Sequence, residues 1–127
     1  MPFVRIDVSA GVHADKLRAI SEGVYRGLRE SVGAPLDDWF HVVSRHDETN
    51  FIYSRDYLKM NRSKEFVAIQ IFFYAGRTVE QKKSIYKAIA EILHVDPGLR
   101  KEDIMIMLVD TPKENWSYGN GVAQFAS

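Results

Sequence analysis

The sequence predicts an α+β fold in which two β-α-β units form one four-stranded mixed sheet, with two helices on one face. Two strand-like segments with alternating polar and apolar residues are each followed by a segment with helical apolar spacing. Each unit then closes with another strand-like segment, and a β-α-β crossover makes its two strands parallel. The apolar positions of the two helices match at one constant offset, which pairs Ile20, Val24 and Leu28 with Ile85, Ile89 and Leu93.

The first unit begins almost at the amino terminus. Residues 3–8 alternate and are rich in Val and Ile, as expected for a half-buried strand. Apolar residues at three- and four-residue spacing, from Leu17 to Leu28, then predict an amphipathic helix, and Gly33 is a suitable stop. Residues 37–43 are the predicted closing strand.

The second unit repeats this order. Residues 66–74 form a longer apolar strand, and Thr78 with Gln81 has the pattern of a capping box at the start of a helix. The helix is expected to end at Pro97-Gly98, before a closing strand over 102–108. With the helices on one face, the other face of the sheet is left apolar and exposed, which indicates burial in an oligomer.

The chain is expected to be a single domain over residues 1–127. The pseudo-repeats cover approximately 2–46 and 65–110, and the segment between them is rich in aromatic residues, so we expect it to be structured. Residues 111–127 form a tail with aromatic residues and glycines, which is expected to turn and to dock, with a neighbouring subunit as one candidate surface.

Composition excludes several classes of function. Lys plus Arg and Asp plus Glu are both 17, and this zero net charge argues against nucleic-acid binding and against a basic membrane-binding patch. Cysteine is absent, which excludes thiolate metal sites and thiol nucleophiles. No apolar stretch approaches the ~20 residues that span a bilayer. We therefore expect a cytoplasmic protein.

Pro2 is the first candidate for chemistry. Initiator methionine before a small residue is usually removed, which would leave proline with a free secondary amine. Such an amine is a general base when neutral and a general acid when protonated. Pro2 opens the first strand directly, so the sheet would hold its nitrogen in place. Proline at position two is also common without any such role, and retention of Met1 would leave the nitrogen as a non-basic amide.

Three further sets of residues are candidates. Arg77 lies between a strand and the start of a helix, where it would help to bind a carboxylate or phosphate, although a solvated arginine fits equally well. Asp38 precedes a strand, a position also typical of turns. Trp116 and Tyr118 in the tail are suited either to closing an apolar pocket or to packing.

Together these features resemble the tautomerase superfamily. The resemblance is carried by Pro2 at a strand start, by the doubled β-α-β unit, by Gly76-Arg77-Thr78 and by residues 115–121 of the tail. It covers essentially the whole chain, and the length and tail are most similar to the malonate semialdehyde decarboxylase branch. The resemblance implies a homotrimer and a small carboxylate substrate. No cofactor and no metal are expected.

The resemblance also implies roles for single residues. Pro2 and Asp38 match the catalytic proline and its neighbouring aspartate, and Arg77 matches the second of two arginines in the decarboxylases. The first of those arginines falls on Ala75 and is missing; whether Arg62 replaces it in space is left open by the sequence. The tail aromatics of the family fall on Trp116 and Tyr118, as substrate-binding residues.

The function that demands least of such a site is enol–keto tautomerisation of a phenylpyruvate-like 2-keto acid. One alternative is decarboxylation of a 3-oxo acid such as malonate semialdehyde, or hydration of an unsaturated acid. A second alternative is a non-catalytic module that binds a small ligand.

Overall fold

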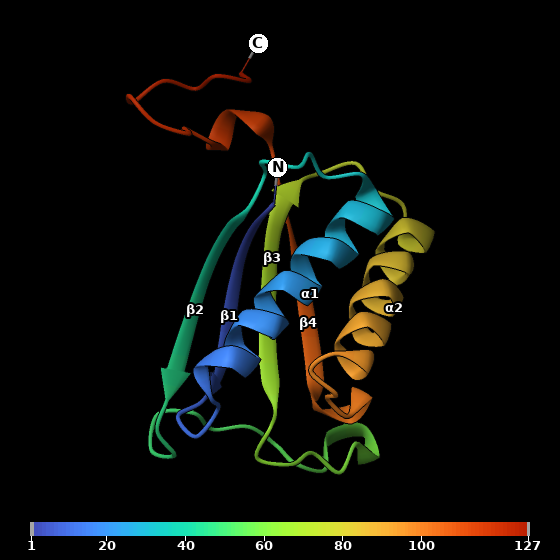
Figure 1. The fold of residues 1–127 in the computed structure, drawn as a ribbon. Coiled ribbons are helices and arrows are strands. Elements are labelled where there is room, and N and C mark those ends of the chain that lie inside the picture. Colours follow the sequence, from blue (N-terminus) through green and yellow to red (C-terminus); the bar gives the residue numbers. More distant parts are fainter. Residues whose placement is uncertain (1, 127) are drawn as a thin grey trace.

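The computed structural model describes residues 2–126, so Met1 and Ser127, which the predicted domain includes, lie outside the described residues. Within this range, a four-stranded mixed sheet carries two α-helices on one face, as predicted (Figure 1). In chain order the elements are β1 (Phe3–Ser9), α1 (Ala14–Val32), β2 (Phe40–His46), β3 (Val67–Tyr74), α2 (Val79–Val95) and β4 (Ile104–Thr111). Short 3-10 helices are Tyr57–Lys59, Lys101–Asp103 and Lys113–Asn115.

The order of the strands relates the two units by an approximate twofold axis. The sheet runs β2-β1-β3-β4, with β1 and β3 antiparallel at the centre and each outer strand parallel to its own unit's first strand. Phe3 lies opposite Phe72, so the beginning of β1 and the end of β3 share one end of the sheet. The tail leaves β4 at this same end, where Figure 1 also shows the amino terminus.

Alternation within the strands separates the core from the open face. Val4, Ile6 and Val8 of β1 point toward the helices and are fully buried. The opposite face carries apolar side chains that remain exposed in the single chain. These are, in part, Phe40 of β2 at 46% exposure and Met105 and Met107 of β4 at 47% each. Such a face is typical of a subunit that associates with copies of itself.

The start of the first closing strand differs from the prediction. We expected the strand over 37–43, but β2 begins at Phe40. The amide of Asp38 donates a hydrogen bond to the carbonyl of Pro35 (3.1 Å), which closes a turn ahead of the strand. The helix signals were read correctly: Thr78 and Gln81 form a reciprocal capping box on α2, and Gly33 ends α1 in the left-handed region at φ 67°.

A close approach between α1 and α2 depends on glycine. A Cβ on Gly27 would lie 2.7 Å from Cγ1 and 3.3 Å from the Cα of Ile89, whereas one on Gly23 would meet the terminal Cδ2 of Leu93 at 2.6 Å. We expect Gly27→Ala to lower the free energy of unfolding by about 1–2 kcal/mol, because overpacking against backbone exceeds the gain in helix propensity. Gly23→Ala, the matched control, should cost less in urea unfolding. Equal losses would contradict this account.

His41 makes folding sensitive to acid. Its Nδ1 lies 2.8 Å from the hydroxyl of Ser21, and burial lowers the pKa of His41 from its ordinary 6.5 to about 4. The unfolded chain therefore binds this proton more readily, so stability is full above pH 6.5 and is lost as the pH falls through 4, by up to roughly 3 kcal/mol. His41→Asn keeps an acceptor for Ser21 and should flatten this part of the stability curve. An unchanged curve would rule His41 out as its cause.

Neither α1 nor α2, the α-helices within residues 2–126, is long and apolar enough to cross a membrane.

Candidate active site

Pro2 and Asp38 are brought together by the pairing of β1 with β2. Phe3 is in register with Phe40, so the residues just before each strand, including Pro2 and Asp38, lie at the same end of the sheet. Pro2 is buried, and Asp38 is only 4% exposed. Burial raises the pKa of the Asp38 carboxyl. A buried carboxyl thus lies at the end of the sheet where β1 begins after Pro2.

Arg77 is held at the same end by the last residues of β3. Its guanidinium carbon lies 4.5 Å from the centre of the Phe73 ring, and its Nη1 donates a hydrogen bond to the carbonyl of Tyr74 (3.0 Å). Continuing the register of Phe3 with Phe72 by one residue places Pro2 opposite Phe73. The half-buried guanidinium is therefore fixed next to the strand end that carries Pro2, with donors left over for an anion.

The aromatic tail docks on this end of its own sheet. Trp116 donates from Nε1 to the hydroxyl of Thr111 (2.6 Å), which in turn donates to the carbonyl of Phe73 (2.8 Å). The rings of Trp116 and Tyr118 are stacked, with centroids 5.6 Å apart and 16° between their planes, and Tyr118 also contacts Phe40. The tail thus places Trp116 and Tyr118 next to the strand ends that carry the other candidate residues.

Tyr74 joins this cluster, and the sequence analysis did not single it out as a site residue. Its hydroxyl lies 2.8 Å from that of Tyr118. Burial is the main cause that raises the pKa of Tyr118, and the charge of Asp38 adds to this effect. The alternation of β3 and the position of Tyr74 at its last residue are the sequence signals that could have placed it on the open face beside the tail.

Arg62 does not replace the arginine that is missing at Ala75 within the chain. It donates to the carbonyls of Glu102 and Ser54, ahead of β3, while Arg77 follows the end of that strand. The 8 residues of β3 lie between the two arginines, a separation of roughly 26 Å at the rise of an extended strand.

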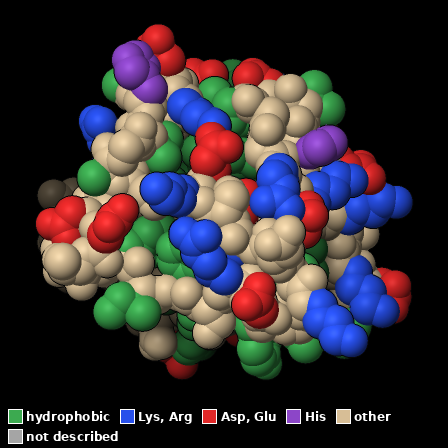
Figure 2. Space-filling model, turned by 90° about the horizontal axis from the view of Figure 1, so that it is seen from below, with side chains coloured by type: hydrophobic (Ala, Val, Ile, Leu, Met, Phe, Trp, Pro, Cys, Tyr) green, Lys and Arg blue, Asp and Glu red, His purple; other side chains and the backbone are tan. Residues whose placement is uncertain are grey.

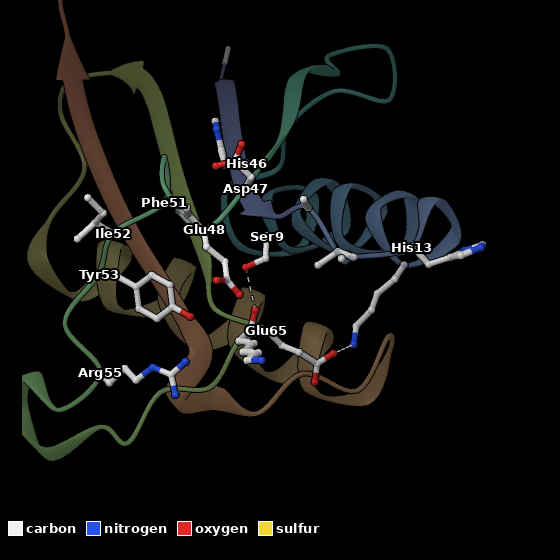
Figure 3. Close-up of a pocket in the computed structure, with 15 residues that line it drawn as sticks. Ser9, His13, His46, Asp47, Glu48, Phe51, Ile52, Tyr53, Arg55 and Glu65 are labelled. Carbon is white, nitrogen blue, oxygen red and sulfur yellow. Dashed lines mark hydrogen bonds and ion pairs between the residues drawn. The ribbon is translucent and has the colours of Figure 1, made fainter.

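A large groove lies at the opposite end of the sheet, away from Pro2 and Arg77 (Figure 3). Its volume is about 1120 Å³, and it is lined by the end of β1, the turn before α1 and the segment after β2. Some of its polar groups are paired with one another: Ser9 donates to the carbonyl of Lys64 (2.9 Å), and Lys16 forms an ion pair with Glu65. Figure 2, a view of this end, shows basic side chains interleaved with acidic ones.

The approximate twofold axis explains why this groove lacks the chemistry of the other end. A shift of 65 residues relates Asp38 to Asp103, Arg77 to Val12 and Pro2 to Val67. Asp103 is fully buried, but its carboxylate accepts hydrogen bonds from the amide (2.7 Å) and hydroxyl (2.5 Å) of Ser63. The groove is therefore lined by Val12 at the position that corresponds to Arg77, and the counterparts of Asp38 and Pro2, Asp103 and Val67, do not line it.

Among residues 2–126, no group of three or more His, Asp or Glu side chains is arranged to hold a metal ion. The candidate site consists of an aspartate, an arginine and aromatic groups around the start of β1.

Comparison with known proteins identifies the family of the chain. A family model described as "Tautomerase enzyme" matches residues 38–119. The Bacillus subtilis (strain 168) protein "Probable tautomerase YusQ" is 38% identical over 124 residues, which cover 98% of each chain. The structure of FG41 malonate semialdehyde decarboxylase inhibited by 3-bromopropiolate has a TM-score of 0.90 and 32% identity, covering 97% of this chain and 93% of the other. A fused 4-OT symmetric trimer shares the fold, with a TM-score of 0.77 and 20% identity over 94% of each chain. The chain is a member of the tautomerase family.

Proposed function

We propose that this tautomerase-family enzyme uses the amine of Pro2 to move a proton on a small 2-keto or enol carboxylic acid. The observation that carries the proposal is the convergence of Pro2, buried Asp38 and the fixed Arg77 guanidinium at one end of the sheet. Loss of Met1 is part of the proposal, because only a free proline nitrogen is basic. Family membership supports a proton transfer of the keto–enol type.

The proposed reaction is the ketonisation of an enol such as that of phenylpyruvate. The neutral amine takes the proton of the 2-hydroxyl as the O–H bond breaks, and negative charge develops on that oxygen. The ammonium then returns the proton to C3 while the C2–C3 double bond becomes a single bond and C2–O becomes a carbonyl. One group acts as base and then as acid, so the amine ends in its starting state.

The other residues bind and orient. Arg77 holds the substrate carboxylate, since a guanidinium matches two carboxylate oxygens in a bidentate fork. Asp38 orients the amine or tunes its basicity. Trp116 and Tyr118 form the apolar wall against which a substrate ring packs.

The direct test is an activity assay with the enol form of phenylpyruvate, followed by its ultraviolet absorbance. We expect catalysed loss of the enol at neutral pH above the buffer rate. A parallel assay would use malonate semialdehyde as the substrate. Formation of carbon dioxide and acetaldehyde there, without loss of the phenylpyruvate enol, would favour the decarboxylase and contradict the proposed tautomerisation. Tight binding of the carboxylic acids without either reaction would favour the non-catalytic binding module and contradict the proposal.

Decarboxylation of a 3-oxo acid is the second candidate, favoured by the 32% identity to the FG41 malonate semialdehyde decarboxylase. Protonated Pro2 would polarise the 3-carbonyl as the bond to the carboxyl carbon breaks, carbon dioxide leaves and the resulting enol takes a proton at C2. Asp38 could activate water in the related hydration of an unsaturated acid. The decarboxylases have two arginines at the positions of Ala75 and Arg77, and this chain keeps the second of them. We therefore place decarboxylation second.

We further propose that the enzyme works as a trimer. The accessible surface of the single chain is 7819 Å², above the about 6,900 Å² typical of a monomer of this mass. Exposed Phe40, Met105 and Met107 on the open face account for part of the excess. The fused 4-OT proteins that share the fold are trimers. Light scattering should give three times the 14.6 kDa chain mass; a monomer at micromolar concentration would contradict this proposal.

A further inference from the structure

The hydroxyls of Tyr74 and Tyr118 form a pair that has one proton to spare. They lie 2.8 Å apart, a normal hydrogen-bond distance for two hydroxyl groups. Each phenol carries one proton, and the bond between them uses one of the two. The accepting phenol therefore keeps an O–H that can donate to a third group.

Packing fixes the position of both rings. Tyr74 belongs to β3, and its ring meets Trp116 edge to face at 5.9 Å and 89°. The ring of Tyr118 stacks on that of Trp116. The backbone amide of Tyr118 donates to Oε1 of Gln124 (3.0 Å), and the side-chain amide of Gln124 donates to the carbonyl of Gly119 (3.1 Å). A donor that is held in place before substrate binds costs little reorganisation during the reaction.

The spare proton belongs on the side of Tyr118 that faces the candidate site. The ring of Tyr118 contacts that of Phe40, the first residue of β2, with centroids 6.4 Å apart, and Asp38 precedes Phe40 by two residues. Tyr74 instead has the ammonium of Lys113 5.7 Å from its ring centre. With Tyr74 as the donor within the pair, the Tyr118 O–H is available to a third group at the end of the sheet that carries Asp38.

We propose that Tyr118 donates a hydrogen bond to the 2-oxygen of a 2-oxo or enol acid, and that Tyr74 is a positioning residue that orients and polarises Tyr118. This proposal rests on the proposed function and names the group that stabilises the enolate oxygen. Tyr118 keeps its proton throughout, so Pro2 remains the group that transfers one. Ala75 stands where the decarboxylases have an arginine, so the chain has no charge at that position. Tyr74, the preceding residue, belongs to the phenol pair, which offers a neutral hydrogen-bond donor instead.

Three phenylalanine variants test the roles by kinetics. Tyr118→Phe should lower kcat by about 10- to 100-fold with little change in KM, because the donor acts mainly as charge develops on oxygen. Tyr74→Phe should lower kcat by about 3- to 10-fold, and the double variant should be no worse than Tyr118→Phe alone, since Tyr74 acts through Tyr118. Tyr86→Phe, on α2 with 38% exposure, is the matched control and should be unaffected. Two results would overturn the proposal: losses in kcat that add in the double variant, or a Tyr118→Phe variant with the kcat of wild type.

A binding experiment separates this proposal from the proposed function. Calorimetry would compare phenylpyruvate with 3-phenylpropionate, which has the carboxylate and the ring but no 2-oxygen. We expect wild-type protein to prefer the 2-oxo acid by about 10-fold, and Tyr118→Phe to lose that preference while binding 3-phenylpropionate unchanged. If the protein shows this binding preference but does not turn over the enol, Tyr118 is the donor and the proposed reaction is wrong. Equal binding of the two acids by wild-type protein, or an unchanged preference in Tyr118→Phe, would overturn the donor even if turnover is observed.

Discussion

Replacing Pro2 with alanine is expected to lower kcat/KM for enol–keto conversion by about 10²- to 10⁴-fold, the range typical for loss of a general acid–base group. Alanine still permits removal of Met1, so a primary amine takes the place of the ring nitrogen. That amine has a freely rotating bond to the chain, whereas the proline ring fixes its nitrogen at the start of β1. The measurement is steady-state ketonisation of the enol of phenylpyruvate.

A second variant separates the amine from the ring. Two residues placed before Pro2 and retained on the chain convert its nitrogen to an amide, while the ring stays in the sequence. We expect this extended protein to be as inactive as Pro2→Ala, with the far-ultraviolet circular dichroism and urea midpoint of the parent. Full activity of the extended protein would show that the proline nitrogen takes no part in the reaction.

Replacing Arg77 with alanine is expected to lower kcat/KM by about 10²-fold or more, chiefly through a higher KM, because the carboxylate then loses its bidentate partner. Arg77→Lys should recover only part of the loss, since an ammonium is a point charge without the planar fork. The guanidinium contacts the Phe73 ring and the carbonyl of Tyr74, so the geometry and the charge both matter.

The matched control for Arg77 is Arg55→Ala. Arg55 is an exposed arginine that lines the groove at the opposite end of the sheet. Its removal changes net charge equally and should leave kcat/KM within about twofold of wild type, as expected for a distant surface charge. If Arg55→Ala impairs turnover while Arg77→Ala does not, the substrate binds in the groove and the assignment of the site is wrong.

The fold could be predicted from the sequence because the two halves of the chain repeat the same β-α-β pattern. Alternation in β1 and β3 and the constant offset between α1 and α2 determine which faces are buried. The antiparallel centre of the sheet, which brings Pro2 to the end of β3, follows from packing two such units side by side. The start of β2 was predicted three residues too early, because the turn closed by Asp38 and Pro35 competes with strand pairing.

Parts of the site could not be read from the sequence. Trp116 and Tyr118 were recognised by type, but their docking on the end of the same sheet depends on how the tail turns after β4. The hydrogen bond between Tyr74 and Tyr118 joins residues 44 positions apart, which no local pattern specifies. The hydrogen bond from the amide of Ser63 to Asp103, the counterpart of Asp38, is likewise invisible in the sequence, because it joins residues 40 positions apart.

The central claim is that the chain carries a reactive amine at Pro2 beside an anion-binding Arg77. Its most direct test is the intact mass of untagged protein before and after incubation at neutral pH with 3-bromopropiolate, followed by peptide mapping. We predict a mass lacking Met1, one adduct per chain located on Pro2, and no adduct in Arg77→Ala. Retention of Met1, or labelling that maps to other residues and persists in Arg77→Ala, would contradict the claim.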